Sequence, residues 1–162
     1  MTWLKLIYHC NALLKSWFFK LIFGKKIEIG KGTTWRKSFQ VNIVKGKLSI
    51  GKNCFFNNYC SLNVLRKVEI GDNSIFGENV KIYDHNHRFN KKEIRLKDQG
   101  YSIGSVKVGR NCWIGSNVIL LKGAEIGDNC VIGAGCVIDG KIPADSIVKN
   151  KNKYVIEEIN FK

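Results

Sequence analysis

VGRNCWIGSNVILLKGAEIGDNCVIGAGCVI, residues 108–138, repeats one pattern every six residues. An aliphatic residue occupies each sixth position, and glycine follows it in most of the repeats. A small or modest residue stands four places after the aliphatic one, at Cys112, Val118, Ala124, Cys130 and Cys136. A fixed period of six is typical of a parallel β-helix, a solenoid in which each short strand adds one side to a stacked coil.

The same period runs through the first half of the chain. Its members are Ile50, Phe56 and Leu62 in one phase and Val64, Ile70, Phe76 and Ile82 in another. In a coil of three strands, the aliphatic residue fills the interior, glycine or asparagine lets the backbone bend, and the small residue fits where the space narrows. An α-helix would need apolar residues three and four apart, and each glycine would cost it about 1 kcal/mol. The repeat therefore predicts an all-β fold.

Composition limits the functional classes without choosing one. A chain of 162 residues suits a single domain. Its formal net charge of +14 predicts attraction to an anion, which could be a phosphorylated cofactor, an acidic sugar, a membrane surface or nucleic acid. Five of the six cysteines occupy the small-residue position of the repeat, so we expect them to be reduced core residues. No CxxC pair points to zinc, and reduced thiols predict a cytoplasmic protein.

Residues 1–26 differ in composition from the repeat. Lysines interrupt a run rich in Trp, Leu, Ile and Phe, which makes it a poor membrane-spanning segment and a poor signal peptide. At 100° per residue the apolar face contains Trp3, Ile7, Cys10, Leu14, Trp17, Phe18 and Leu21, and a narrow polar stripe lies opposite. We expect an amphipathic helix, which either packs across a solenoid or contacts a membrane surface with help from Lys25 and Lys26.

The repeat disappears between Asp84 and Ile103, where the sequence is DHNHRFNKKEIRLKDQGYSI. These charged side chains could not replace interior aliphatic residues without unpaired burial, so the stretch must protrude as a loop. Pro143 marks the end of the clean repeat. The expected organisation is an N-terminal helix (1–26), a repeat domain (27–148) with the protruding loop (84–103), and a basic C-terminal cap (149–162).

Two histidines, His85 and His87, stand beside Asp84 where the repeat breaks. A neutral histidine, with an ordinary pKa near ~6.5, can take a proton from a hydroxyl and return one to a leaving group. A DHNH string on a polar loop is by itself weak evidence, because surface histidines are often only solvated. The repetitive scaffold around the loop is what makes it a candidate site.

The repeats, the histidine-bearing loop and the run VKVGRNCWIGSNVILLKGAEIGDNCVIGAGCVIDGKIP resemble the hexapeptide-repeat acyltransferases. They are especially similar to the galactoside, maltose and bacterial-polysaccharide O-acetyltransferases, over about residues 27–143. The resemblance implies a left-handed parallel β-helix, although parallel connections are normally right-handed. It also implies a homotrimer that binds acetyl-CoA in clefts between neighbouring solenoids.

The resemblance also implies roles for individual residues. His85 matches the position of the catalytic base, and Trp113, Ser116 and Ala134 match residues along the cofactor. Asn57 aligns with an acceptor-binding asparagine, and we expect Asp84 and His87 on the acceptor side, although His87 could instead orient His85 or have no role. The usual Gly-x-Pro segment is absent, so we expect the coenzyme A phosphates to be met by the basic residues Lys149, Lys151 and Lys153.

The resulting hypothesis is an acetyl-CoA-dependent O-acetyltransferase that acts on a sugar of a surface polysaccharide or its precursor, without metal and without binding nucleic acid. An N-acetyltransferase acting on an amino sugar would use the same base and cofactor. A zinc carbonic anhydrase would need three separated histidines, which this chain does not offer. A non-enzymatic basic solenoid should show one continuous basic face with interleaved aromatic residues, whereas these lysines are scattered along the sequence.

Overall fold

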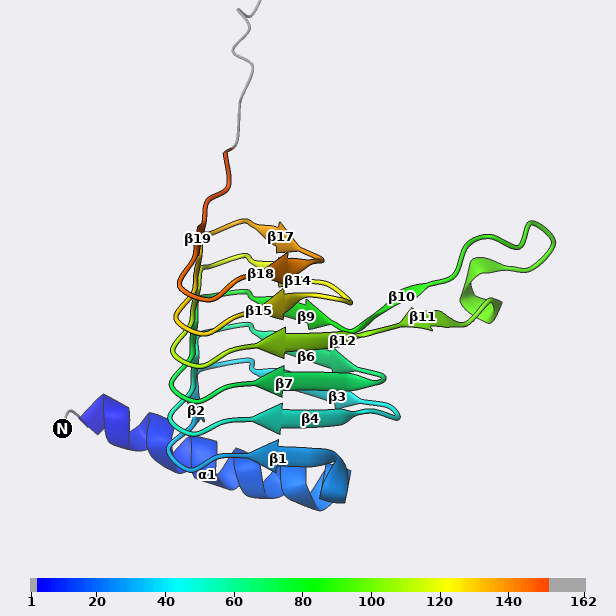
Figure 1. Cartoon of the computed structure of the whole chain (residues 1–162). Helices are drawn as coiled ribbons and strands as arrows, with labels where there is room; N and C mark the ends of the chain where they lie inside the picture. Colours follow the sequence, from blue (N-terminus) through cyan, green and yellow to red (C-terminus); the bar gives the residue numbers. More distant parts are fainter. Residues whose placement is uncertain (1–2, 152–162) are drawn as a thin grey trace, which may run out of the picture.

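The computed structural model describes residues 3–151, and the side chains of residues 3–11 and 13 fall outside that description. The chain coils into a parallel β-solenoid with three faces, and a helix lies at its N-terminal end (Figure 1). In Figure 1 the near strands run leftward and the fainter far strands rightward as the chain climbs, so the coil is left-handed. The β-helix predicted from the period of six is thus confirmed.

Each face of the solenoid is one parallel sheet. The first sheet contains β1 (Ile27–Ile29), β4 (Lys47–Ile50), β7 (Lys67–Ile70), β12 (Ser105–Val108), β15 (Glu125–Ile126) and β18 (Lys141–Ile142). The second contains β2 (Thr34–Trp35), β5 (Phe55–Phe56), β8 (Ile75–Phe76), β13 (Trp113–Ile114), β16 (Val131–Ile132) and β19 (Ile147–Val148). The third contains β3 (Gln40–Ile43), β6 (Ser61–Val64), β9 (Lys81–Tyr83), β14 (Ile119–Leu120) and β17 (Val137–Ile138). The last strand, β19, lies beyond Pro143 and ends at Val148, inside the range 27–148 expected for the repeat domain.

The interior is one continuous apolar column. Aromatic rings fill its N-terminal half, where Phe39 lies 4.8 Å from Phe56 and Phe56 lies 4.5 Å from Phe76 between ring centroids. The cysteines of the repeat are free and buried, as predicted. Burial raises the pKa of the Cys60 thiol to about 11, because the charged thiolate would lose its hydration.

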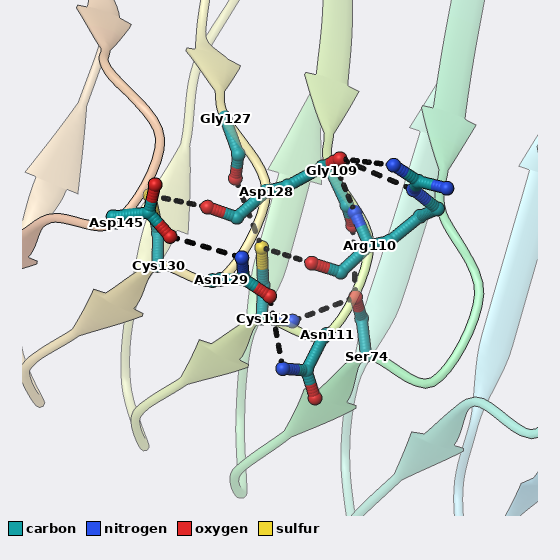
Figure 2. Close-up of polar contacts among 10 residues, drawn as sticks. All are labelled: Ser74, Gly109, Arg110, Asn111, Cys112, Gly127, Asp128, Asn129, Cys130 and Asp145. Atoms are coloured by element: carbon teal, nitrogen blue, oxygen red, sulfur yellow. Dashed lines mark hydrogen bonds and ion pairs between the residues drawn. The ribbon is translucent and has the colours of Figure 1, made fainter.

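Asparagine holds many of the corners between strands. Asn111 and Asn129 have φ of 55° and 56°, in the left-handed region that asparagine tolerates better than most residues. Their side chains form a ladder along the solenoid, from Asn111 Nδ2 to Asn129 Oδ1 at 3.0 Å and from Asn129 Nδ2 to Asp145 Oδ1 at 2.9 Å (Figure 2). The polar corner residues therefore satisfy one another from coil to coil.

Helix α1 (Trp3–Phe23) and the short 3-10 helix η1 (Gly24–Lys26) precede the first coil. Phe19 is buried against the coil, with its ring centroid 5.8 Å from that of Trp35 and 6.2 Å from that of Phe39. Lys15 Nζ donates to the Phe39 carbonyl at 2.6 Å, and burial lowers the pKa of this lysine. Within residues 3–151, no helix combines the length and the mean hydropathy needed to cross a bilayer.

The helix does not pack with the face that the sequence suggested. Ala12 and Phe19 are buried, whereas Leu14, Trp17 and Phe18 remain exposed. Since α1 is apolar on both sides, one apolar strip covers the end of the solenoid and a second strip faces outward.

The predicted loop is a protruding hairpin (Figure 1). Strand β10 (His85–His87) pairs with β11 (Tyr101–Ile103) in antiparallel register, and the 3-10 helix η2 (Leu96–Asp98) lies between them. The hairpin is closed at its base, where the Gly104 N–H donates to the Asp84 carbonyl at 2.7 Å. The coil then resumes at β12 without any change in the stacking.

Candidate functional site

The base of the hairpin joins His85 to Asp84. His85 Nδ1 lies 2.9 Å from Asp84 Oδ1, and the histidine side chain is mostly covered. A carboxylate can only accept, so Nδ1 carries the hydrogen in this contact and Nε2 of the neutral ring keeps its lone pair. The pair is thus an oriented histidine whose free nitrogen can accept a proton.

Asp84 is held by the scaffold rather than facing outward. Its side chain is fully buried. The carboxylate accepts backbone N–H groups from Leu65 at 2.8 and 3.0 Å, from Arg66 at 2.6 Å and from Lys67 at 2.8 Å. Asp84, expected on the acceptor side, has a buried carboxylate that contacts His85 and these backbone N–H groups, an arrangement that favours a role in orienting His85.

Tyr101 packs against both histidines and was missed by the sequence reasoning. Its ring centroid lies 5.2 Å from that of His85, edge to face, and 4.5 Å from that of His87. Tyr101 stands directly opposite His87 in the hairpin register. The alternation of side chains along paired strands could have revealed this neighbour, but only once the pairing was known.

A pocket of about 370 Å³ opens beside the outer part of the hairpin. His87, Arg88, Phe89 and Lys122 are among its lining residues, and no acidic side chain lines it. Phe89 is 81% exposed. Cationic side chains next to an uncovered aromatic ring suit a polar, anionic or sugar-like ligand.

The residues expected along the cofactor are stacked on the second sheet and on the corner that follows it. Trp113 lies in β13 and is 55% exposed. One coil later, Ala134 lies above Ser116, and the Gly135 N–H donates to the Ser116 carbonyl at 2.9 Å. Lys149 follows on the next coil, beyond the pairing of Ile132 with Val148. Lys151 is exposed, and Lys153 lies outside the described residues.

Asn57 belongs to the same corner, at its N-terminal end. Its Oδ1 accepts from Arg36 Nη1 at 3.4 Å and from the Asn58 N–H at 2.9 Å. Asn57 follows β5 of the second sheet, whereas the hairpin with His85 leaves from β9 of the third sheet. The structure therefore brings Asn57, Ser116 and Ala134 to one corner and His85 to another.

The outward face of the second sheet is apolar. Its outward side chains stack in register, and after Thr34 in β2 they are Phe55, Ile75, Trp113, Val131 and Ile147. The outward face of the first sheet instead alternates charges, with Glu69, Lys107, Glu125 and Lys141 in register. Trp113 thus sits in the middle of an apolar ladder, on a face unlike its charged neighbour.

A metal centre finds no support in the described part of the chain. Residues 3–151 contain no group of three or more His, Cys, Asp or Glu side chains arranged to hold a metal ion.

Comparison with known proteins agrees with this architecture. The family model for the bacterial transferase hexapeptide (six repeats) matches residues 105–140. Galactoside O-acetyltransferase of Escherichia coli strain K12 is 35% identical over 113 residues, which cover 70% of this chain and 55% of that protein. The putative lipopolysaccharide biosynthesis O-acetyl transferase WbbJ of the same strain is 27% identical and is covered over 64% of its length. The chain thus spans less than two thirds of the length of each of these two curated relatives.

Solved structures match over more of their length. A maltose O-acetyltransferase from Clostridium difficile 630 is 31% identical, with a TM-score of 0.61 over 88% of this chain and 75% of that one. A galactoside acetyltransferase in complex with coenzyme A is also 31% identical, with a TM-score of 0.56 over 75% of this chain and 66% of that one. From the period of six, the three-sided coil and these similarities, the chain belongs to the hexapeptide-repeat acetyltransferase family.

Proposed function

We propose that this protein transfers an acetyl group from acetyl-CoA to a sugar hydroxyl, with His85 as general base. The observation that carries the proposal is the oriented pair at the base of the hairpin, in which His85 Nδ1 lies 2.9 Å from a buried carboxylate. Family membership supports the acyl donor, because the related galactoside acetyltransferase was solved with coenzyme A.

In the proposed reaction, His85 Nε2 takes the proton of the sugar hydroxyl while the hydroxyl oxygen attacks the thioester carbonyl. The C–S bond then breaks, and the proton passes from the histidine to the departing thiolate of coenzyme A. Asp84 keeps the ring in the tautomer that accepts at Nε2, and it stabilises the imidazolium formed during transfer. Such a base contributes about 100-fold to 10,000-fold in rate, and positioning supplies the rest.

The cofactor would lie along the corner after the second sheet. Trp113 offers an exposed apolar surface for the pantetheine arm, and Ser116 and Ala134 form a narrow column beside it. We assign the phosphates to Lys149 and Lys151, which are exposed at the C-terminal end of this corner, and by position in the sequence to Lys153. When bound, acetyl-CoA supplies the activated acetyl group.

A homotrimer would complete the site. In one chain the proposed base and the proposed cofactor residues lie at different corners of the coil. A neighbouring copy could bring its hairpin to this cofactor corner, and the apolar ladder around Trp113 offers a surface for that contact. Asn57, at the same corner, would then meet an acceptor held between two copies.

For the acceptor we propose a sugar of a bacterial surface polysaccharide or of its lipid-linked precursor. The similarity to WbbJ supports this class, and the pocket with Arg88, Phe89 and Lys122 could hold such a sugar. We propose that His87, which lines that pocket, contacts the acceptor. The free cysteines fit a cytoplasmic enzyme, and a membrane-linked acceptor would give residues 1–26 a role at the inner face of the membrane.

The test is mass spectrometry of a panel of sugars and lipid-linked glycans incubated with acetyl-CoA. The expected result is a gain of one acetyl group with the unchanged protein and at least a 100-fold slower gain with His85→Asn. His87→Asn, matched in size and chemistry, should weaken acceptor binding and keep most of the turnover. Near-normal turnover in His85→Asn with loss in His87→Asn would move the base to His87. Hydroxylamine treatment separates an O-acetyl ester, which it cleaves, from an N-acetyl amide.

A further inference from the structure

Helix α1 leaves a complete apolar stripe uncovered. Leu14, Trp17, Phe18, Leu21 and Ile22 follow the spacing of one helix face and are 52 to 70% exposed. The opposite strip, with Phe19, already covers the end of the solenoid. An apolar stripe of this size marks a surface that contacts something other than water.

An open pocket of about 570 Å³ lies between this stripe and the first coil. Leu14, Trp17 and Phe18 line it from the helix, and Trp35 and Arg36 are among the residues lining it from the coil. Three cationic residues, Lys15, Arg36 and Lys37, also line the pocket, and no acidic residue does. A ligand with an anionic headgroup therefore suits it.

The charge around the stripe has one sign. Residues 1–39 contain eight Lys or Arg and a single acidic residue, Glu28, which is bound to Lys47 at 2.7 Å. Lys20, Lys25 and Lys26 are exposed at the C-terminal end of the helix region. A cationic belt beside an apolar stripe is the pattern of a helix that lies in the interface of an anionic bilayer.

We propose that the N-terminal end of the solenoid docks on an anionic phospholipid bilayer. The exposed stripe of α1 enters the acyl region, and the pocket beside Trp35 accepts the phosphate of one lipid headgroup. A second copy of this chain is the poorer occupant, because it would bring the same positive charge to the contact. A phospholipid supplies both the apolar chains and the anion.

This orientation sets the height of the hairpin above the membrane. The hairpin leaves the third coil, two coil steps above the first, and each step is about 5 Å. With a helix about 10 Å thick below the first coil, the histidines lie roughly 20 Å from the lipid-facing surface. If the proposed acetyl transfer holds as well, the reacting sugar is a few residues away from its lipid anchor.

The first experiment is flotation of the full chain with phosphatidylglycerol vesicles and with phosphatidylcholine vesicles. Binding should favour the anionic vesicles. Trp17→Ser with Leu21→Ser should lower the partition coefficient at least ten-fold. The control Val137→Ser, which changes a 59% exposed apolar residue of the third sheet, should not change it. Lys20→Gln with Lys25→Gln should lower binding about five-fold per charge on the anionic vesicles. Equal binding to both kinds of vesicle, or unchanged binding in the Trp17–Leu21 variant, overturns the proposal.

A second readout follows the stripe directly. The tryptophan emission of the protein should shift to the blue with anionic vesicles, and Trp17→Phe should bind as well but show a smaller shift. Light scattering without lipid tests whether a second copy of the chain covers the stripe instead. A lower molecular mass in solution for the Trp17→Ser, Leu21→Ser variant than for the unchanged protein would show that it does. If inorganic phosphate alone produced the same blue shift as the anionic vesicles, the site would bind free phosphate and not a lipid headgroup. Acetyl transfer to a soluble sugar is measured apart from these assays, so failure of docking leaves the proposed reaction standing.

Discussion

Removal of the Asp84 carboxylate is the sharpest test of how the scaffold holds the candidate base. In Asp84→Ala, three backbone N–H groups, from Leu65, Arg66 and Lys67, lose their acceptor, and His85 loses its Nδ1 partner. An unsatisfied buried donor costs about 1–3 kcal/mol. Because this corner lies near solvent, we take the low end for each N–H, which predicts a loss of roughly 3 kcal/mol in the free energy of unfolding.

The assay is urea unfolding followed by far-UV circular dichroism and by tryptophan fluorescence. Coincident transitions and an unchanged slope with denaturant would show that the midpoint reports stability. Asp139→Ala is the matched control, because Asp139 is exposed at another corner and should change stability by less than about 0.5 kcal/mol. A loss below about 1 kcal/mol in Asp84→Ala would refute the account of a carboxylate held by three backbone donors.

Three further predictions concern the solenoid itself. Gly71→Ala should lower the free energy of unfolding by about 1–3 kcal/mol, because the added Cβ would lie 2.6 Å from a backbone carbon of the next coil. Gly140→Ala is the control in the same urea assay and should be neutral, because no atom lies within 4 Å of its added Cβ. Since burial raises the pKa of Cys60 from 9.0 to about 11, the unfolded chain ionises first, and stability should fall by on the order of 2 kcal/mol between pH 9 and 11. Cys60→Ala should flatten that fall, and an unchanged pH profile would contradict the assignment. Arg110 Nη2 lies 2.7 Å from Asp128 Oδ2 on the surface (Figure 2). Arg110→Ala should therefore lower the midpoint of thermal unfolding only slightly, and by less at high salt. A loss that does not depend on salt would speak against an exposed ion pair.

The interior of the fold was predictable because the period of six is local. Each coil repeats the same residue types in the same order, so Ile114, Ile132 and the cysteine positions could be placed inside without knowing what they contact. Handedness was not predictable this way, because the spacing of the repeat is the same in either hand. It entered through the resemblance to a family.

The packing of α1 could not be derived from its pattern. Leu14 and Trp17 are as apolar as Ala12 and Phe19, so the sequence offered two faces that could cover the solenoid. The choice depends on the shape of the first coil, where Phe19 fits against the rings of Trp35 and Phe39.

The sequence predicted only part of the candidate site. His85 and Asp84 were visible as neighbours, but the burial of Asp84 depends on backbone N–H groups, which every residue except proline carries and which leave no trace in a sequence. The contact of Tyr101 with both histidines required the antiparallel pairing of β10 and β11. The positions of the proposed cofactor residues relative to His85 required the assignment of each strand to a face.

The hairpin is closed at its base and again where the Arg88 N–H donates to the Gly100 carbonyl at 3.0 Å, which makes residues 89–99 a replaceable part. Strands β7 and β12 pair in full register across the insertion, and β9 and β14 do the same. Lengthening, shortening or exchanging the segment between Arg88 and Gly100 would therefore leave the neighbouring coils, Asp84 and both histidines as they are. If the proposed function holds, exchange of this segment would change the acceptor preference, while the proposed cofactor residues at the corner after the second sheet would stay in place.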